Sequence, residues 1–356
     1  MMSIQSKLSG LEIASVSRFA PAKTTKAQPG MFSLNTDVLF RIAAELDFQS
    51  LQTWRMTCRA ADEIGAMLLR TRYNGALNRH LADPDGFRSV LRATMSVVSG
   101  STVLHIIDQA RSPTWAPNDL DIYAPLDGAG RVASYLIDVE HYTRKAVQEP
   151  TYDGVYAGFK AVIHLSKGDL QIDVIQSITT SALYPLPFFW STHVMNYFTA
   201  DMFCVVYPTY TFQGRGLLNP AVLISKQYPT IRTLQVIGKY QTRGYDFRVY
   251  PYAWAEGTEL DCTSDEGCPR IIRFFGDRYC CVGSLDTVAQ SLMTDGVRGY
   301  PNRTRMVRWW RGGPACGDKC THGDDDFALR ANPTVQTHQV PVEFYLLWLN
   351  GRPAVI

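Results

Sequence analysis

The chain has 356 residues, of which 46% are hydrophobic and 19% are charged, and its formal net charge at pH 7 is +2. This composition excludes a wholly disordered chain, and the small net charge excludes the strong positive field by which many nucleic-acid and membrane-surface binders act. No apolar run approaches the roughly 18 residues that a membrane-spanning helix needs, so we expect no membrane span.

Residues 1–30 are rich in Ser, Ala, Lys and Thr and lack the apolar segment of a signal peptide. Their basic residues outnumber the single Glu12. This stretch predicts a flexible tail. A mitochondrial transit peptide is the alternative interpretation.

Helical periodicity begins within residues 31–80, where apolar side chains recur at intervals of three or four. Val38, Ile42 and Leu46 define one amphipathic helix, and a second pattern begins at Leu51. We expect two or three linked helices that form a small module.

This module resembles an F-box through Leu34, Val38, Leu39, Ile42, Leu46, Leu51, Trp54, Cys58 and Arg59. Asn35 replaces the usual proline of that family, and the usual aromatic residue after the Cys-Arg pair is missing. The resemblance implies binding to the Skp-type adaptor of a cullin ubiquitin ligase through Leu39, Ile42, Leu46 and Trp54, and a location in the cytoplasm or nucleus. A generic helical cap is the alternative.

Strand and helix patterns alternate through residues 85–255, which predicts a mixed α/β core. The predicted helices are 87–94, 102–109, 130–139 and 188–202, and the predicted strands are 95–99, 119–123, 161–165, 170–175 and 203–207. The strands 161–165 and 170–175 are predicted to form a hairpin that turns at Lys167-Gly168. Residues 111–118, which contain two prolines, read as a loop.

Three aspartates stand at matching positions of the predicted strands. Asp119 and Asp121 share one face of their strand because strand side chains alternate, and Asp173 alternates with apolar residues in another strand. Converging carboxylates raise one another's pKa unless a cation neutralises them. Oxygen ligands favour Mg²⁺ or Mn²⁺, which complete their coordination with substrate phosphates.

Gly100 and Ser101 stand where a predicted strand becomes a helix. Glycine lets a phosphate approach the backbone, and a helix N-terminus favours anions. The two residues therefore predict a phosphate-binding turn.

Gly100-Ser101, the Asp119-x-Asp121 strand and the later Asp173 together resemble the polymerase-beta-like nucleotidyltransferase superfamily over about residues 87–176. The resemblance implies that Gly100 and Ser101 hold a nucleoside triphosphate, that Asp119 and Asp121 bind two Mg²⁺ ions, and that Asp173 binds one metal and helps to deprotonate the attacking hydroxyl. The segment between Ser101 and Asp119 is longer than usual for that family, which implies an insertion. Asn196 and Tyr197 are further candidates for contact with the nucleobase, on position alone.

Residues 256–356 form a region rich in cysteine, expected to be irregular and packed on the core. Its candidate metal ligands are Cys262, Cys268, Cys280, Cys316, Cys320 and His322. Thiolates and imidazole suit a structural Zn²⁺ ion, whereas disulfides or plain buried thiols are alternatives. A basic aromatic stretch, Arg303 to Arg311 with Trp309 and Trp310, reads either as a surface that stacks bases or as an edge strand.

The sequence therefore predicts a nucleotidyltransferase-like mixed sheet flanked by helices, between an F-box-like helical module and the Cys-rich region. The leading functional hypothesis is metal-dependent transfer of a nucleotidyl group from a nucleoside triphosphate to a hydroxyl of RNA, protein or a small molecule. The alternative is an inactive fold that recognises a substrate for a ubiquitin ligase.

Overall fold

The computed structural model of the chain describes residues 35–150, 158–220, 223, 229–254, 266–286, 305–311 and 334–339. The chain divides into a unit of residues 1–35 and a unit of residues 36–356, and every element below belongs to the second unit. The α-helices are α1 (Thr36–Glu45), α2 (Phe48–Arg55), α3 (Arg59–Leu77), α4 (Pro84–Thr94), α5 (Gly100–Ile107), α6 (Ala129–Asp138), α7 (Pro208–Phe212) and α9 (Ile231–Gln241). Single 3-10 turns are η2 (Ser112–Thr114), η3 (Leu186–Phe188), η4 (Thr192–Val194) and η5 (Pro251–Trp254).

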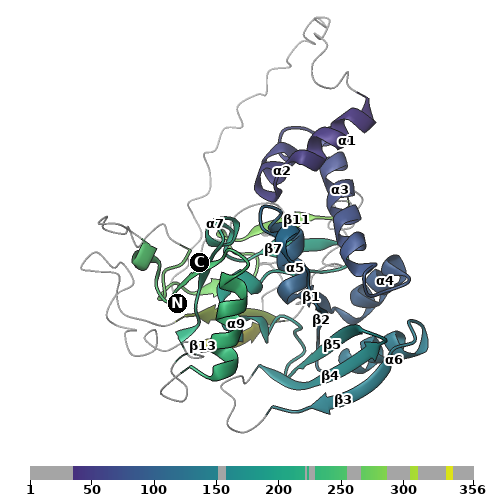
Figure 1. Ribbon diagram of the computed structural model, residues 1–356, viewed down its shortest axis with the longest axis vertical. Helices are drawn as coiled ribbons and strands as arrows, with labels where there is room; N and C mark the ends of the chain where they lie inside the picture. The colour runs from purple at the N-terminus through teal and green to yellow at the C-terminus, as the bar shows by residue number, and fades with distance from the viewer. Residues whose placement is uncertain are drawn as a thin grey trace, which may run out of the picture. The chain divides into compact units, whose positions relative to one another are not determined.

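The strands are β1 (Val97–Ser99), β2 (Asp119–Ala124), β3 (Thr143–Gln148), β4 (Phe159–Lys167), β5 (Leu170–Ser177), β6 (Tyr197–Phe198), β7 (Met202–Val205), β8 (Arg215–Leu217), β9 (Asp246–Arg248), β10 (Arg273–Phe274), β11 (Cys281–Ser284), β12 (Arg305–Trp310) and β13 (Thr334–Gln339). Within the described ranges, eight of them form one sheet in the order β11-β7-β6-β1-β2-β5-β4-β3 (Figure 1). Only β2 and β5 run parallel in this sheet. This mixed sheet flanked by helices confirms the expected α/β class.

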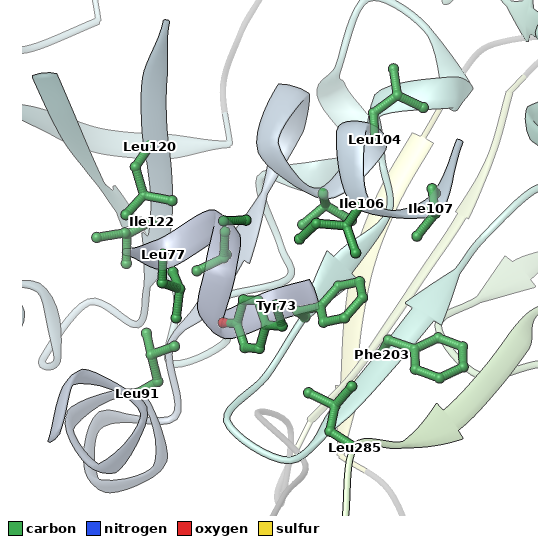
Figure 2. Close-up of a cluster of buried hydrophobic side chains, with 14 of the residues drawn as sticks. Tyr73, Leu77, Leu91, Leu104, Ile106, Ile107, Leu120, Ile122, Phe203 and Leu285 are labelled. Carbon is green, nitrogen blue, oxygen red and sulfur yellow. The ribbon is translucent and has the colours of Figure 1, made fainter. Parts of the chain in front are cut away.

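The main core lies between the helices and one face of the sheet. Leu120 and Ile122 of β2 point into it and are fully buried. Figure 2 shows side chains from α3, α4, α5, β2, β7 and the residue after β11 gathered in this cluster, namely Tyr73, Leu77, Leu91, Leu104, Ile106, Ile107, Leu120, Ile122, Phe203 and Leu285. Because strand side chains alternate, burial of Leu120 and Ile122 places Asp119 and Asp121 on the opposite face.

The first three helices form where the apolar spacing predicted two or three. The carboxylate of Asp47 caps α2 by accepting a hydrogen bond from the Ser50 amide at 2.7 Å. Phe48 begins α2, and its ring lies edge-on to Phe203 of β7 with centroids 5.1 Å apart. The helices therefore share the main core with the sheet.

Most of the predicted core elements are present within a few residues of their expected bounds. The hairpin of β4 and β5 turns through Gly168 at a φ of +59°, the left-handed region that glycine enters without strain. The expected helices 87–94, 102–109 and 130–139 correspond to α4, α5 and α6.

The predicted helix over 188–202 is wrong. That segment contains the turns η3 and η4 and then β6. Its polar side chains bond the backbone instead: the Asn196 side chain donates to the His193 carbonyl at 2.8 Å and accepts from the Val206 amide at 2.9 Å. Thr199 accepts from the Met202 amide in the same way. These local bonds compete with helical ones and favour turns.

Part of the Cys-rich region belongs to the sheets. β11 pairs with β7 at the edge of the large sheet, and β12 lies between β10 and β13 in a three-stranded sheet. β12 is therefore the central strand of that sheet and not the edge strand expected for the basic aromatic stretch. A second cluster of buried apolar side chains includes Tyr197, Phe275 and Trp309.

Among the helices that the structure describes, none has the length and apolar character needed to cross a bilayer.

We predict that Phe48→Ala lowers the free energy of unfolding by about 3–5 kcal/mol, because Phe48 is 1% exposed and its removal leaves a cavity between α2 and the sheet. Met56→Ala is the control, since Met56 is 80% exposed, and it should change stability by less than about 0.5 kcal/mol. Urea unfolding followed by far-UV circular dichroism measures both. Equal, small effects would show that the helices do not fold together with the sheet.

Candidate functional site

The parallel pairing of β2 with β5 brings the three aspartates together on one face of the sheet. Asp121 lies directly opposite Asp173, and Asp119 lies opposite Gln171. All three aspartates are half-buried. Two strands that are far apart in the sequence thus present three carboxylates from neighbouring positions.

Gly100 lies against this group at the junction of β1 and α5. Its φ is +70°, and a Cβ atom built on it would stand 2.5 Å from Oδ2 of Asp121. A side chain at this position would be strained and would collide with the carboxylate, so both observations require glycine. The Gly-Ser turn therefore lies in direct contact with the aspartates.

No side chain caps the first turn of α5. Ser99 occupies the N-cap position, but its hydroxyl donates to the Asn196 carbonyl at 2.7 Å and makes no capping bond to the helix. Ser101 follows in the first turn and is buried. The N-terminus of α5 thus meets the polar face of the sheet beside Asp121, as an anion-binding turn requires.

Burial and the charges of neighbouring carboxylates disfavour the ionised forms of Asp121 and Asp173. The pKa of Asp121 lies well above its ordinary value, first because of burial and then because of the charges of Asp119 and Asp173, while Lys239 opposes the shift. The pKa of Asp173 is also raised by burial, against a hydrogen bond from His164. A cation bound here would relieve this repulsion.

His164 is a member of the site that the sequence analysis missed. Its Nδ1 lies 2.7 Å from Oδ1 of Asp173, and its Nε2 lies 3.3 Å from Oε1 of Gln148. The signal was present in the hairpin: a two-residue turn that pairs Lys167 with Leu170 also pairs His164 with Asp173.

Helix α9 brings positive charge to the same region. The charge of Lys239 acts on Asp121, and the charge of Arg232 acts on Asp173. These two residues are seven positions apart and so share one face of the helix. In the described part of the chain, however, no ion pair within 4.0 Å joins α9 to the aspartates.

The long segment between α5 and β2 fastens the end of α9 to the core. Arg111 forms an ion pair with Asp108 at 3.1 Å and donates to the carbonyls of Gly244 and Gln213, both at 3.1 Å. The Tyr245 hydroxyl donates to the same Asp108 carboxylate at 2.7 Å. The expected insertion therefore positions α9 relative to α5.

The donor set fits a hard divalent cation. Within the described ranges, no group of three or more His, Cys, Asp or Glu side chains is placed to hold a metal ion by itself. Mg²⁺ and Mn²⁺ do not require one, because they keep several waters and take oxygens from substrate phosphates. Carboxylate oxygens suit such an ion better than zinc, which prefers thiolate and imidazole ligands.

Asn196 and Tyr197 are not placed to bind a nucleobase, because both side chains are buried in the fold. Asn196 is 1% exposed, and its amide bonds the backbone of the fold. Tyr197 is 2% exposed and packs edge-on against Phe275 at 5.6 Å. We therefore do not include either residue in the site.

His193 is a core residue. It is fully buried among aromatic rings, and its Nδ1 lies 3.0 Å from the Ser191 hydroxyl. Burial, with a smaller contribution from Arg243, lowers the pKa of His193 to about 3. The fold therefore holds this imidazole in its neutral form at pH 7.

We predict that His193→Phe reduces the loss of stability in acid. The unfolded chain binds a proton at His193 below about pH 6.5 whereas the folded chain does not, so the stability present above pH 6.5 is lost as the pH falls. The contribution of one such group is about 1.4 kcal/mol per pH unit down to the folded pKa. Chemical denaturation of both proteins between pH 7 and pH 4 tests this, and parallel pH profiles would contradict it.

Only two of the six candidate zinc or disulfide residues lie in the described ranges. Cys268 is buried beside Ile271 and Tyr279. Cys280 lies near Arg273, whose Nη2 is 3.6 Å from its sulfur, and burial raises the pKa of this thiol. Cys262, Cys316, Cys320 and His322 lie outside the described residues.

The described part of the basic aromatic stretch is mostly buried. Trp309 is 2% exposed and donates from its indole nitrogen to the Tyr207 hydroxyl at 3.1 Å. Arg311 is 7% exposed and donates to the carbonyls of Leu218 and Val249. These side chains stabilise the packing of the three-stranded sheet.

The four residues proposed to bind an adaptor have different surroundings. Leu39 is 7% exposed and belongs to the main core, and Leu46 and Trp54 pack against that core while partly buried. Ile42 is 44% exposed, and Val38, one turn earlier on α1, is 42% exposed. The apolar surface that a partner can reach on α1 is therefore that of Val38 and Ile42.

No protein-family model matches the chain, and a search of curated proteins finds no match to it.

Proposed function

We propose that the chain is a metal-dependent nucleotidyltransferase, which moves a nucleotidyl group from a nucleoside triphosphate to a hydroxyl. The observation that carries the proposal is the contact of Gly100 with Asp121, which stands opposite Asp173 on a parallel strand. A phosphate-binding turn and a group of carboxylates then adjoin at one point. This is the pairing that metal-assisted phosphoryl chemistry needs.

Each residue has a distinct role in this proposal. The backbone amides at Gly100 and Ser101 bind the triphosphate at the N-terminus of α5. Asp119 and Asp121 hold Mg²⁺ or Mn²⁺, and Asp173 holds one metal and orients the acceptor hydroxyl, whose proton it accepts. When bound, the metals supply stabilisation of the charge that develops on the attacking and leaving oxygens.

The reaction balances as an in-line displacement at the α-phosphorus. A bond forms from the acceptor oxygen to that phosphorus while the bond to the bridging oxygen of the β-phosphate breaks, and pyrophosphate leaves. Lys239 and Arg232, whose charges reach the aspartates from α9, are placed to offset the negative charge of the phosphates.

We predict that the protein releases pyrophosphate from at least one of the four nucleoside triphosphates with Mn²⁺, and that Asp121→Asn combined with Asp173→Asn lowers the rate about 100-fold or more. Asp169→Asn is the control, because Asp169 is exposed at the turn of the same hairpin. Release of labelled pyrophosphate measures the rate.

The melting temperature of the variant distinguishes a loss of activity from a loss of folding. Since burial and neighbouring charges disfavour the Asp121 carboxylate, Asp121→Asn should raise the melting temperature in the presence of a chelator. No pyrophosphate release and no nucleotide-dependent thermal shift with any of the four nucleotides would contradict the proposed function.

A second candidate function is docking to a Skp-type adaptor through α1, which the exposure of Val38 and Ile42 favours. Val38→Ser with Ile42→Ser should abolish binding to a purified adaptor without lowering stability, because both side chains are more than two-fifths exposed. Calorimetric titration measures the binding. Unchanged binding by the variant, or no binding by the unaltered chain, would contradict this candidate.

A further inference from the structure

His164 and Asp173 stand opposite each other on the antiparallel strands β4 and β5. One ring nitrogen, Nδ1, lies 2.7 Å from Oδ1 of Asp173, and the other, Nε2, lies 3.3 Å from Oε1 of Gln148 on β3. Both ring nitrogens thus face polar atoms of neighbouring strands. The orientation of the imidazole is therefore set from both sides, as is common for a group that orients a ligand.

The two carboxylate oxygens of Asp173 have different surroundings. Oδ1 lies within hydrogen-bond distance of the imidazole, and none of the residues that the structure describes forms a hydrogen bond to Oδ2. A carboxylate on a strand can otherwise rotate about its side-chain bonds, and χ2 of aspartate is broad. A hydrogen bond to one oxygen restricts that rotation and fixes the direction of the other.

We propose that His164 is a positioning residue, which holds Asp173 so that its second oxygen is presented to the cation bound by Asp119 and Asp121. This inference rests on the proposed function, and it adds a residue that neither the Gly-Ser turn nor the aspartate pattern contains. The imidazole itself contacts neither the nucleotide nor the metal. Asp173 would hold the cation in its ionised form, with Nδ1–H of His164 donating to Oδ1.

Two amide substitutions separate positioning from a general structural role. The side-chain nitrogen of asparagine can occupy the place of Nδ1, whereas glutamine extends its amide to the place of Nε2. His164→Asn should therefore retain the hydrogen bond to Asp173, and His164→Gln should lose it. Both variants are polar and His164 is about a third exposed, so both are expected to fold.

The measurement is the binding of Mn²⁺ alone, and of Mn²⁺ with a non-hydrolysable nucleoside triphosphate analogue, by electron paramagnetic resonance of the free ion. His164→Gln should weaken Mn²⁺ binding on the order of 10–100-fold, the usual effect of removing a group that orients a metal ligand. His164→Asn should recover most of that loss. Ser166→Ala, two residues along β4, is the control and should bind Mn²⁺ as the unaltered protein does.

The outcomes distinguish this inference from the proposed function. Equal Mn²⁺ binding by His164→Gln and the unaltered protein, tighter binding by His164→Gln, or equally weak binding by both amide variants would overturn the role of His164. If Asp121→Asn and Asp173→Asn then still abolish Mn²⁺ binding, the proposed function stands without it. If those two variants also bind Mn²⁺ normally, the proposed function fails and the role of His164 fails with it.

Discussion

Repulsion among the carboxylates of Asp119, Asp121 and Asp173 is the interaction on which the rest of the site depends. Burial is the larger cause of the raised pKa values of Asp121 and Asp173, and the charges of the neighbouring carboxylates add to it. A fold gains nothing in stability by holding such groups together, because each charge costs more when it is buried beside others of the same sign. Their convergence is the feature on which the proposed cation site rests.

The strands that carry these carboxylates also carry the core. On β2, Leu120 and Ile122 are fully buried on one face, and the aspartates between them lie on the other. Alternation along a strand makes the two functions inseparable, since a shift of one residue in register would bury the charges and expose the apolar side chains. The packing of α3, α4 and α5 on the apolar face thus fixes where the carboxylates lie.

Neighbouring elements adjust the site from three sides. Gly100 approaches Asp121 closely because it has no side chain and adopts a positive φ. His164 bonds Asp173 from the next strand, and the charges of Lys239 and Arg232 on α9 act on Asp121 and Asp173. The segment from Asp108 to Arg111 ties the end of α9 to α5.

Local patterns in the sequence determined the mixed α/β class, the hairpin of β4 and β5 and the placing of the three aspartates on strands. These features depend on alternation, glycine turns and helical spacing, all of which act over a few residues. The helix expected over 188–202 failed because side-chain bonds of Asn196 and Thr199, directed partly at distant backbone groups, outweigh apolar periodicity. Only the tertiary structure decided that β2 pairs with β5 in parallel, that α9 lies near the aspartates and that Leu39 is buried while Ile42 is exposed, because these depend on contacts between segments far apart in the chain.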